Sequence, residues 1–319
     1  MTAARRPSGA AWQRFGPLLG LATLFVALSF ASPYFLTVDN LLNVLRQSSI
    51  NAILALGQLM VIITAGIDLS IGSVVGVTSV VLAMLLVAGW HPFSACAAAV
   101  ALGLSIGLLN GLLLTRLRLP HPFISTLGTM NVARGAALLL AGGVPISGLP
   151  LAFRGATGGN ASGIPMPVIF AAAAYAAAHV FLTRTVWGRD LYAIGGNREA
   201  ARLAGIPVER RLNLAYALSG FTAALAAIVL AGRMNSGFPL AGSGAELDAI
   251  AAAIIGGASF FGGVGTVGGT LIGALIIGFL RNGLNLLDVS AYWQMVVIGC
   301  VIVAAVFVDV LRQRGTRTS

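Results

Sequence analysis

Apolar residues fill long stretches of this chain, and short polar links separate them. Ten stretches approach the length of about 20 apolar residues that a membrane-crossing helix needs. They cover residues 17–36, 48–66, 69–88, 93–114, 123–141, 165–183, 212–231, 248–262, 267–284 and 292–309. Because backbone polar groups in a bilayer must bond within the protein, the pattern predicts an all-α membrane protein with about ten transmembrane helices. We expect one domain over residues 1–319.

One stretch is weaker than the others. Residues 248–262 are short for a crossing and rich in glycine. We therefore expect this segment to be tilted, broken or re-entrant.

Composition supports a lipid-facing surface. Hydrophobic residues make up 58% of the chain and charged residues 9%, and the mean hydropathy is +0.94. A soluble domain carries about 25% charged residues, because its surface must face water. The net charge of +10 comes entirely from arginine, since the chain has no lysine. These arginines cluster between apolar stretches instead of following one face, which argues against a nucleic-acid partner.

The arginines also predict an orientation. With a cytoplasmic N-terminus and ten alternating spans, most of the 19 arginines lie on the cytoplasmic side, as the positive-inside rule requires. These are Arg5, Arg6, Arg14, Arg116, Arg118, the arginines of 183–211, Arg312, Arg314 and Arg317. Arg46, Arg154, Arg233 and Arg281 then lie outside or at the outer interface, and Arg134 lies within a span. Both termini are expected in the cytoplasm.

Two longer polar segments stand between apolar stretches. The outer one, about 142–164, is rich in Gly, Ser and Pro and is typical of a lid or docking loop. The inner one, about 184–211, contains a short helix signal from Asn197 to Ala204. Asn197 is a good N-cap, Glu199 suits the positive N-terminal end, and Gly205 with Pro207 ends the helix. A short helix on the cytoplasmic face is a candidate contact for a soluble partner.

Several motifs bear on the source of energy and on packing. Without lysine the chain has no Walker A motif, so energy must come from a separate subunit or an ion gradient. The match to G-x-G-x-x-G at 263–268 lies between membrane segments, where close backbone approach is a better explanation than nucleotide binding. Glycines that share a helix face predict tight helix packing: Gly103, Gly107 and Gly111, and Gly269 with Gly273.

Polar residues within the apolar stretches are candidates for a solute path. Asp68, with Ser70, either caps the next helix at an interface or takes part in a pathway. Arg134 is expected to face protein or a water-filled cavity. Asn110, Asn131 and Asn282 either share such a cavity and suit hydroxyl-rich ligands, or hydrogen-bond between helices. The translocation-path candidates are therefore Asp68, Ser70, Asn110, Asn131, Arg134 and Asn282.

Nothing in the sequence predicts an enzyme, a metal site or a cofactor. Glu246 and Asp248 are best explained by the dipole at a helix N-terminus. His91, His121 and His179 are far apart and lack Cys or carboxylate companions at metal-ligand spacing.

Five segments resemble the permease subunits of bacterial ABC importers for simple sugars, of the ribose, xylose, arabinose or galactoside type. They are AGIDLSIGS (65–73), PFISTLGTMNVARG (122–135), GRDLYAIGGNREAARLAGI (188–206), ELDAIAAAIIGGASFFGGVGTVGGTLIGA (246–274) and RNGLNLL (281–287). The resemblance implies a pore of two ten-span permeases, identical or paralogous, in the bacterial inner membrane. It also implies cytoplasmic ATPase subunits and a periplasmic sugar-binding protein as partners.

The resemblance also implies a coupling site. Glu199, Ala200, Ala201 and Gly205 are similar to the EAA-type motif that docks the short helix in the ATPase. With Gly195 and Asn197 they are the candidate coupling residues. The Ile and Leu-Pro that often follow this motif are absent at matching spacing.

Alternatives remain for the cargo and for the mechanism. The same importer class includes permeases for branched-chain amino acids, nucleosides and a signalling sugar, and the sequence does not specify which sugar is carried. An ion-coupled secondary transporter needs a carboxylate near a mid-span unwound helix, and Asp68 is the only candidate.

Overall fold

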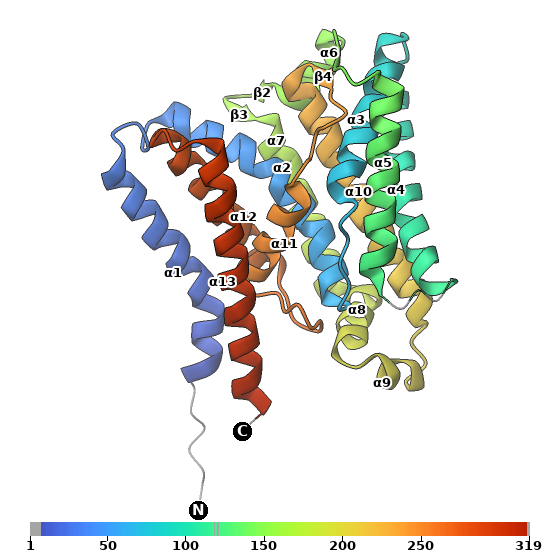
Figure 1. The fold of residues 1–319 in the computed structure, drawn as a ribbon, viewed down its shortest axis with the longest axis vertical. Coiled ribbons are helices and arrows are strands. Elements are labelled where there is room, and N and C mark those ends of the chain that lie inside the picture. The colour runs from blue at the N-terminus through green and yellow to red at the C-terminus, as the bar shows by residue number, and fades with distance from the viewer. Residues whose placement is uncertain (1–7, 118, 120, 318–319) are drawn as a thin grey trace, which may run out of the picture.

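The computed structural model describes residues 8–117, 119 and 121–317. These residues form helices and four two-residue strands, arranged as Figure 1 shows. The helices are α1 Ser8–Ala31, α2 Val38–Ile63, α3 Ile71–Val87, α4 Pro92–Thr115, α5 Pro122–Ala141, α6 Leu151–Gly158, α7 Met166–Arg184, α8 Val186–Gly196, α9 Arg198–Leu203, α10 Val208–Met234, α11 Ala245–Ile255, α12 Val267–Leu286 and α13 Ala291–Arg317. Strand β1 Ile146–Ser147 pairs antiparallel with β4 Ser236–Gly237, and β2 Asn160–Ala161 pairs antiparallel with β3 Ile164–Pro165.

The number of crossing helices differs from the prediction. Among the described residues, 7 helices are long and apolar enough to cross a membrane: α2, α4, α5, α7, α10, α12 and α13. The apolar part of α1 and the whole of α3 are shorter apolar helices. Each of the ten predicted stretches does contain a helix, but a count of about ten spans is not confirmed.

The segment 248–262 is broken, as expected. Helix α11 has 11 residues and ends at Ile255, and residues 256–266 are not helical. At 1.5 Å per residue such a helix is about 16 Å long, roughly half the hydrocarbon thickness of a bilayer. Directly after the helix, Gly257 has φ of +93°. A left-handed glycine at this position is a common helix stop, which explains why α11 ends there.

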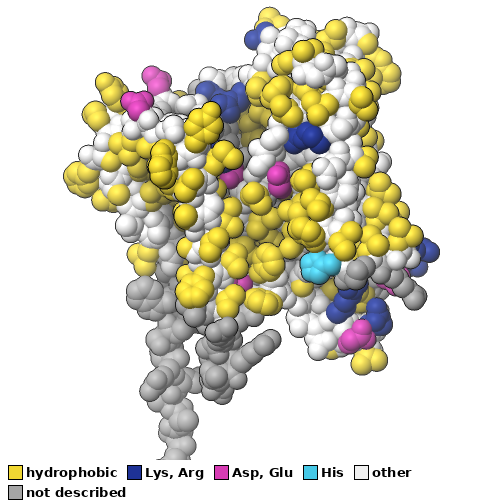
Figure 2. Space-filling view, viewed as in Figure 1, with side chains coloured by type: hydrophobic (Ala, Val, Ile, Leu, Met, Phe, Trp, Pro, Cys, Tyr) yellow, Lys and Arg dark blue, Asp and Glu magenta, His cyan; other side chains and the backbone are white. Residues whose placement is uncertain are grey.

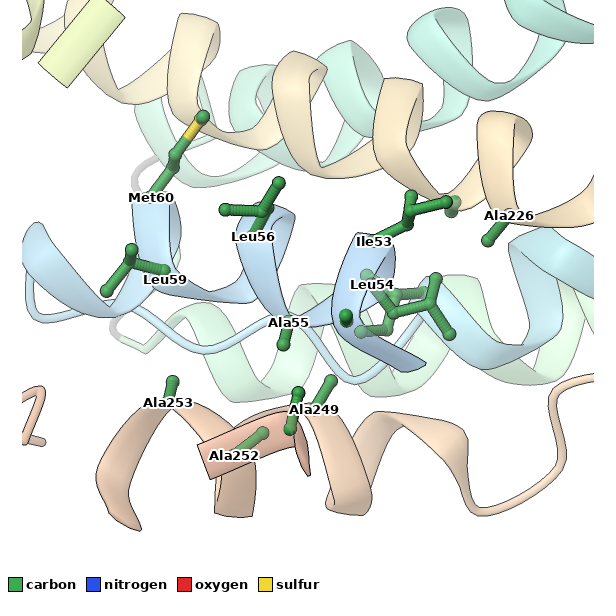
Figure 3. Packing of buried hydrophobic residues seen from close by; sticks show 14 of the residues in the cluster. Ile53, Leu54, Ala55, Leu56, Leu59, Met60, Ala226, Ala249, Ala252 and Ala253 are labelled. Carbon is green, nitrogen blue, oxygen red and sulfur yellow. The ribbon is translucent and has the colours of Figure 1, made fainter. Parts of the chain in front are cut away.

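Helices α2 and α10 form the centre of the molecule. α10 packs against α4, α2 and α3, and α2 also contacts α7, α11 and α12. On α2, Ile53, Leu54 and Leu59 are fully buried. Figure 3 shows these side chains between α10 and the alanines of α11. Small residues on the neighbouring helices therefore let large ones on α2 fill the centre.

Glycines allow the closest helix contacts. A Cβ at Gly107 of α4 would strike the Tyr216 carbonyl oxygen of α10, and one at Gly220 of α10 would strike that of Gly103. On α12, a Cβ at Gly273 would strike the Ala252 carbonyl oxygen of α11. The predicted tight packing along both glycine faces is confirmed.

The molecule has two ends of different character. Helices α8 and α9 lie at the same end as the first turn of α1 and the last turn of α13, whereas α6 and the strands lie at the other (Figure 1). These are called the α9 end and the α6 end below. Arg5, Arg6 and Arg118, on which the predicted orientation partly depends, lie outside the described residues.

Both polar segments contain structure that the sequence did not predict. In 142–164, Pro150 precedes α6, whose Phe153 is buried against α3, α4 and α10 residues. In 184–211, the Thr185 hydroxyl caps α8 by accepting a hydrogen bond from Gly188 N at 3.1 Å. Neither segment is therefore a plain loop.

Candidate functional site

The predicted short helix is present as α9. Asn197 Oδ1 accepts a hydrogen bond from Ala200 N at 2.9 Å, which is the expected N-cap. Gly205, at φ +82°, follows the end of the helix. The cap and the stop signal are confirmed, and α9 runs over Arg198–Leu203.

Helix α9 is held by one face only. Ala201 is buried with Ile194, Val208 and Leu212. The opposite face is open: the Glu199 side chain is 74% exposed, although it pairs with Arg202 at 2.7 Å. Leu203 is 88% exposed. The open face combines an apolar side chain with charges, as a surface for another protein does.

Helix α8, which directly precedes α9, contacts a part of the chain that is distant in sequence. We call residues 256–266 the glycine loop. Gly263 N donates to the Ile63 carbonyl oxygen at 2.8 Å, and the Tyr192 hydroxyl donates to that of Gly265 at 2.8 Å. A Cβ at Gly195 would meet both Ile63 O and Gly263 N. The close backbone approach predicted for 263–268 is thus confirmed at Gly263, whereas Gly265 lies against side chains and a Cβ at Gly268 would meet nothing within 4 Å.

An ion pair fixes α8 to the start of α10. Arg211 Nε donates to Asp190 Oδ2 at 2.6 Å, and both side chains are mostly buried. The Arg211 guanidinium also lies over the Trp187 ring, 5.6 Å from its centroid. Such an arginine on an aromatic face adds to the stability of the contact. The segment 184–211 is therefore attached to the core on both sides of α9.

Asp68 is the centre of a buried polar cluster. Its Oδ1 accepts hydrogen bonds from Ser70 N at 2.9 Å and from Ser70 Oγ at 2.6 Å, and its Oδ2 accepts one from Ser219 Oγ at 2.7 Å. Asn110 Nδ2 donates to Ser70 Oγ at 2.8 Å. In the amide orientation that satisfies both groups, Gln58 Nε2 donates to Asp68 O at 3.1 Å and Gln58 Oε1 accepts from Asp68 N at 3.3 Å. These five residues are called the Asp68 cluster below.

The cluster favours the capping role over the pathway role for Asp68. The carboxylate satisfies the amide of Ser70, which is the N-cap position of α3. However, Asp68 is only 1% exposed, so it is not the exposed interfacial group that the sequence suggested. Gln58 and Ser219 were missed, because they lie on α2 and α10 and nothing in their spacing points to Asp68.

The other translocation-path candidates lie elsewhere. Arg134 Nη1 donates to the carbonyl oxygens of Pro239 at 2.6 Å and Ala241 at 2.9 Å, so it faces protein as expected. Asn282 and Asn40 exchange two hydrogen bonds between α12 and α2, at 2.7 and 3.1 Å.

Asn131 is exposed and donates within its own helix, to Leu127 O at 3.1 Å. The structure brings Asn110 to Asp68 but places Asn131 and Asn282 apart from it. Of the two alternatives for these asparagines, hydrogen bonding to another part of the fold describes Asn110 and Asn282, and the three do not share one cavity.

A cavity of about 620 Å³ lies beside α9. It is lined by Arg198 and Arg202 of α9, Thr64 at the end of α2, Thr115 at the end of α4, and Tyr216 of α10, among others. The Tyr216 hydroxyl donates to Ile67 O at 3.3 Å, one residue before Asp68. The cavity therefore ends close to the Asp68 cluster.

A second cavity, of about 250 Å³, lies toward the α6 end between α2, α10, α11 and α12. Arg281 Nη2 donates to Asp248 Oδ2 at 2.6 Å in its wall. We call it the Asp248 cavity. Asp248 lies in the first turn of α11, as the sequence predicted. Its partner on α12 was missed, because the two lie on different predicted helices.

The seven apolar helices and the mostly buried centre define a multi-pass α-helical membrane protein. A sequence profile of the family described as branched-chain amino acid transport system / permease component matches residues 40–306. The chain belongs to this family of transport permeases.

Three relatives show how similar the chain is to proteins with an assigned cargo. The ribose import permease protein RbsC of Bacillus subtilis is 46% identical, over 93% of this chain and 92% of its own length. The D-allose transport system permease protein AlsC of Escherichia coli K12 is 40% identical, over 93% and 92%. The galactose/methyl galactoside import permease protein MglC of Salmonella typhimurium is 37% identical, over 98% of both chains. No solved structure gave a significant match.

Proposed function

We propose that this chain is the membrane-spanning subunit of an ATP-driven importer for a simple sugar. The observation that carries the proposal is the 46% identity to a ribose import permease over nearly the full length of both chains. Relatives for allose and galactose import support the same cargo class. Because the chain contains no lysine, a P-loop ATPase must be a separate subunit.

The coupling site in this proposal is α9 and its flanks. Its residues are Gly195, Asn197, Glu199, Ala200, Ala201 and Gly205. The open face of α9 docks in the ATPase, and the α9 end, with both chain termini, faces the cytoplasm of a bacterial cell. The attachment of α8 to α10 and of Gly195 to the glycine loop supports this role, because a push on α9 reaches the core directly.

The solute path in this proposal involves a second permease subunit, identical or paralogous. Among the path candidates Asp68, Ser70, Asn110, Asn131, Arg134 and Asn282, Asn131 is the one with an exposed side chain. It lies on a face of α5 where Cβ atoms at Gly128 and Gly135 would meet nothing within 4 Å. This face is open to a partner subunit or a passing solute. The α6 end then faces the periplasm and receives the sugar-binding protein.

Co-purification tests the proposal. The permease, expressed with its genomic neighbours, should bring down an ATPase whose activity rises several-fold when a sugar-loaded binding protein is added. Proteoliposomes of this complex should take up ribose, allose or galactose only with ATP inside. Uptake that persists in ATP-depleted vesicles with no ATPase recovered would establish the secondary transporter instead.

The family description favours one second candidate, a branched-chain amino acid as cargo. The same proteoliposomes distinguish it, because ATP-dependent uptake of leucine with no uptake of any sugar would reassign the cargo within the same importer class.

A further inference from the structure

The Asp248 cavity contains hydrogen-bonding groups that the protein itself does not use. Within the described residues, the Asn51 amide, the Arg233 guanidinium and Asp248 Oδ1 have no hydrogen-bond partner. Asp248 is buried, Asn51 and Arg233 are half-buried, and Arg281 Nε in the same wall is buried with no partner among the described residues. Polar groups in a folded protein normally have partners, so unused groups around a cavity are available to an occupant. We infer that the Asp248 cavity binds one sugar molecule within a single subunit.

This inference rests on the proposed function, and the lining explains why the occupant is a sugar. The amide of Asn51 both donates and accepts, the carboxylate of Asp248 accepts, and the guanidinium of Arg233 donates. Sugar hydroxyls also both donate and accept, so they match a mixed set of this kind. Gln47 and Ser243 add another amide and a hydroxyl at the cavity wall.

Charge argues against a solute that carries an ammonium group. The Asp248 carboxylate already has a counter-ion in Arg281, at 2.6 Å. An amino acid would bring an ammonium group with no unpaired carboxylate to receive it, and burying an unpaired charge is costly. Arg233 lies near the cationic Arg46, so this side of the cavity repels ammonium groups as well.

The size of the cavity and its apolar wall further restrict which molecules can occupy it. A volume of about 250 Å³ is roughly eight times the share of one water molecule in the liquid, which suits one small ring and excludes an oligosaccharide. Ile50, Leu54 and Leu230 form the apolar part of the wall. They suit the C–H face of a sugar ring, because ligand pockets combine apolar surface with a few placed polar groups.

The cavity is also well placed for a solute arriving at the α6 end. On the face in Figure 2, basic and acidic side chains gather in the furrow between the α1–α12–α13 side and the α3–α4–α5 side. The surrounding surface is largely apolar. The same two helices that line the cavity, α2 and α10, carry the Asp68 cluster further along. A sugar in the cavity would therefore contact the central helix pair directly.

Direct binding tests the inference. The probe is ribose, allose or galactose, added to the complete permease–ATPase complex without binding protein or nucleotide. Saturation-transfer NMR should detect binding with a Kd of about 1–10 mM, a range that corresponds to only a few kcal/mol. Ser243→Phe fills the mouth of the cavity from an exposed position, and Asn51→Leu removes an amide that has no partner in the described structure. Each should weaken binding at least fivefold.

A matched control separates the cavity from general effects. Ser290→Phe makes the same change at another exposed serine, just before α13. This variant should bind sugar within twofold of the unmodified protein.

Three results would overturn the inference. The first is no saturation transfer to any of the three sugars at about 100 mM, a concentration at which a site with a Kd of 10 mM would be mostly filled. The second is equal binding by the cavity variants and the control. The third is stronger saturation transfer to leucine than to any sugar. If the same preparation shows ATP-dependent sugar uptake, the proposed function remains supported whichever of these three results is obtained. Loss of all sugar uptake by the unmodified complex would instead refute the proposed function.

Discussion

Two buried aspartates, Asp68 and Asp248, lie beside the helix pair α2 and α10, and they differ in how many hydrogen bonds their carboxylates accept. Asp68 is 1% exposed and accepts three hydrogen bonds from two serines. Asp248 is 5% exposed but has one ion pair, and its Oδ1 has no partner in the described structure. The Asp68 carboxylate is hydrogen-bonded within the fold, whereas the Asp248 carboxylate borders a cavity.

The difference shows that burial alone does not identify a ligand site in this protein. A carboxylate has about four acceptor positions, and what matters is whether the protein fills them. Asp68 is used by the fold, since it caps α3 and bonds to α10. Asp248 keeps acceptor capacity beside an open volume. Substitutions at the two sites should therefore separate stability from sugar handling.

The largest stability effect should come from Asp68→Leu. Three buried donors lose their acceptor, and each unsatisfied group costs about 1–3 kcal/mol, so we expect a loss of at least about 3 kcal/mol. Thermal unfolding of the purified permease in detergent measures it. Asp68→Asn, which keeps one acceptor oxygen, should lose less. An unchanged melting temperature for Asp68→Leu would show that the cluster is not structural.

Gly107→Leu tests why the region around the cluster is closed. The new side chain would strike the Tyr216 carbonyl oxygen, so α4 and α10 must separate. We expect a loss of about 1–3 kcal/mol, as for overpacking in other well-packed cores. Gly128→Leu on α5 is the control, since nothing lies within 4 Å of its Cβ position. Equal melting temperatures for the two variants would contradict the close crossing.

Asp248→Asn should cost clearly less than Asp68→Leu. The Arg281 side chain is 40% exposed and can reach water, so we expect a loss of about 1 kcal/mol. Sugar binding to the permease–ATPase complex should nevertheless fall at least fivefold. If Asp248→Asn were as destabilising as Asp68→Leu and bound sugar normally, the contrast between the two aspartates would disappear.

The smallest stability effect should accompany Glu199→Arg. Glu199 is exposed and its pair with Arg202 is a surface pair, so the melting temperature should stay within experimental error. Uptake should fall about tenfold or more, because the charge on the proposed docking face is reversed, a change that affects partner association. Glu209→Arg, at another exposed acid in the first turn of α10, is the control. Normal uptake by Glu199→Arg would count against α9 as the coupling helix.

The sequence predicted where the helices lie much better than how they meet. All ten apolar stretches contain a helix, and the Asn197 cap correctly placed α9, because both signals depend on neighbouring residues. The short length and glycines of 248–262 correctly predicted an irregular segment, but they did not show whether it is tilted, broken or re-entrant, nor that the helix ends at Ile255. Helices α6 and α8 were missed because their segments are too polar and too short to stand out.

The candidate site was less predictable, for a related reason. Ser219 lies 151 residues from Asp68, and Arg281 lies 33 residues from Asp248, on another helix. Such partners depend on which helix faces come together, and spacing along one chain does not contain that information. Arg134 was an exception: an arginine inside an apolar stretch must find protein acceptors, and it does, at Pro239 and Ala241.

The contact between Gly195 and the glycine loop has a mechanical consequence. Main-chain atoms meet there with no side chain between them, and Gly263 is hydrogen-bonded to the end of α2. A side chain at this contact could change rotamer and absorb a displacement, whereas two backbones in direct contact form a rigid connection. Asp309 braces the far side of the loop against α13, through Phe260 N at 3.1 Å. A tilt of the segment that contains α9 would therefore displace the end of α2, the glycine loop and α13 together.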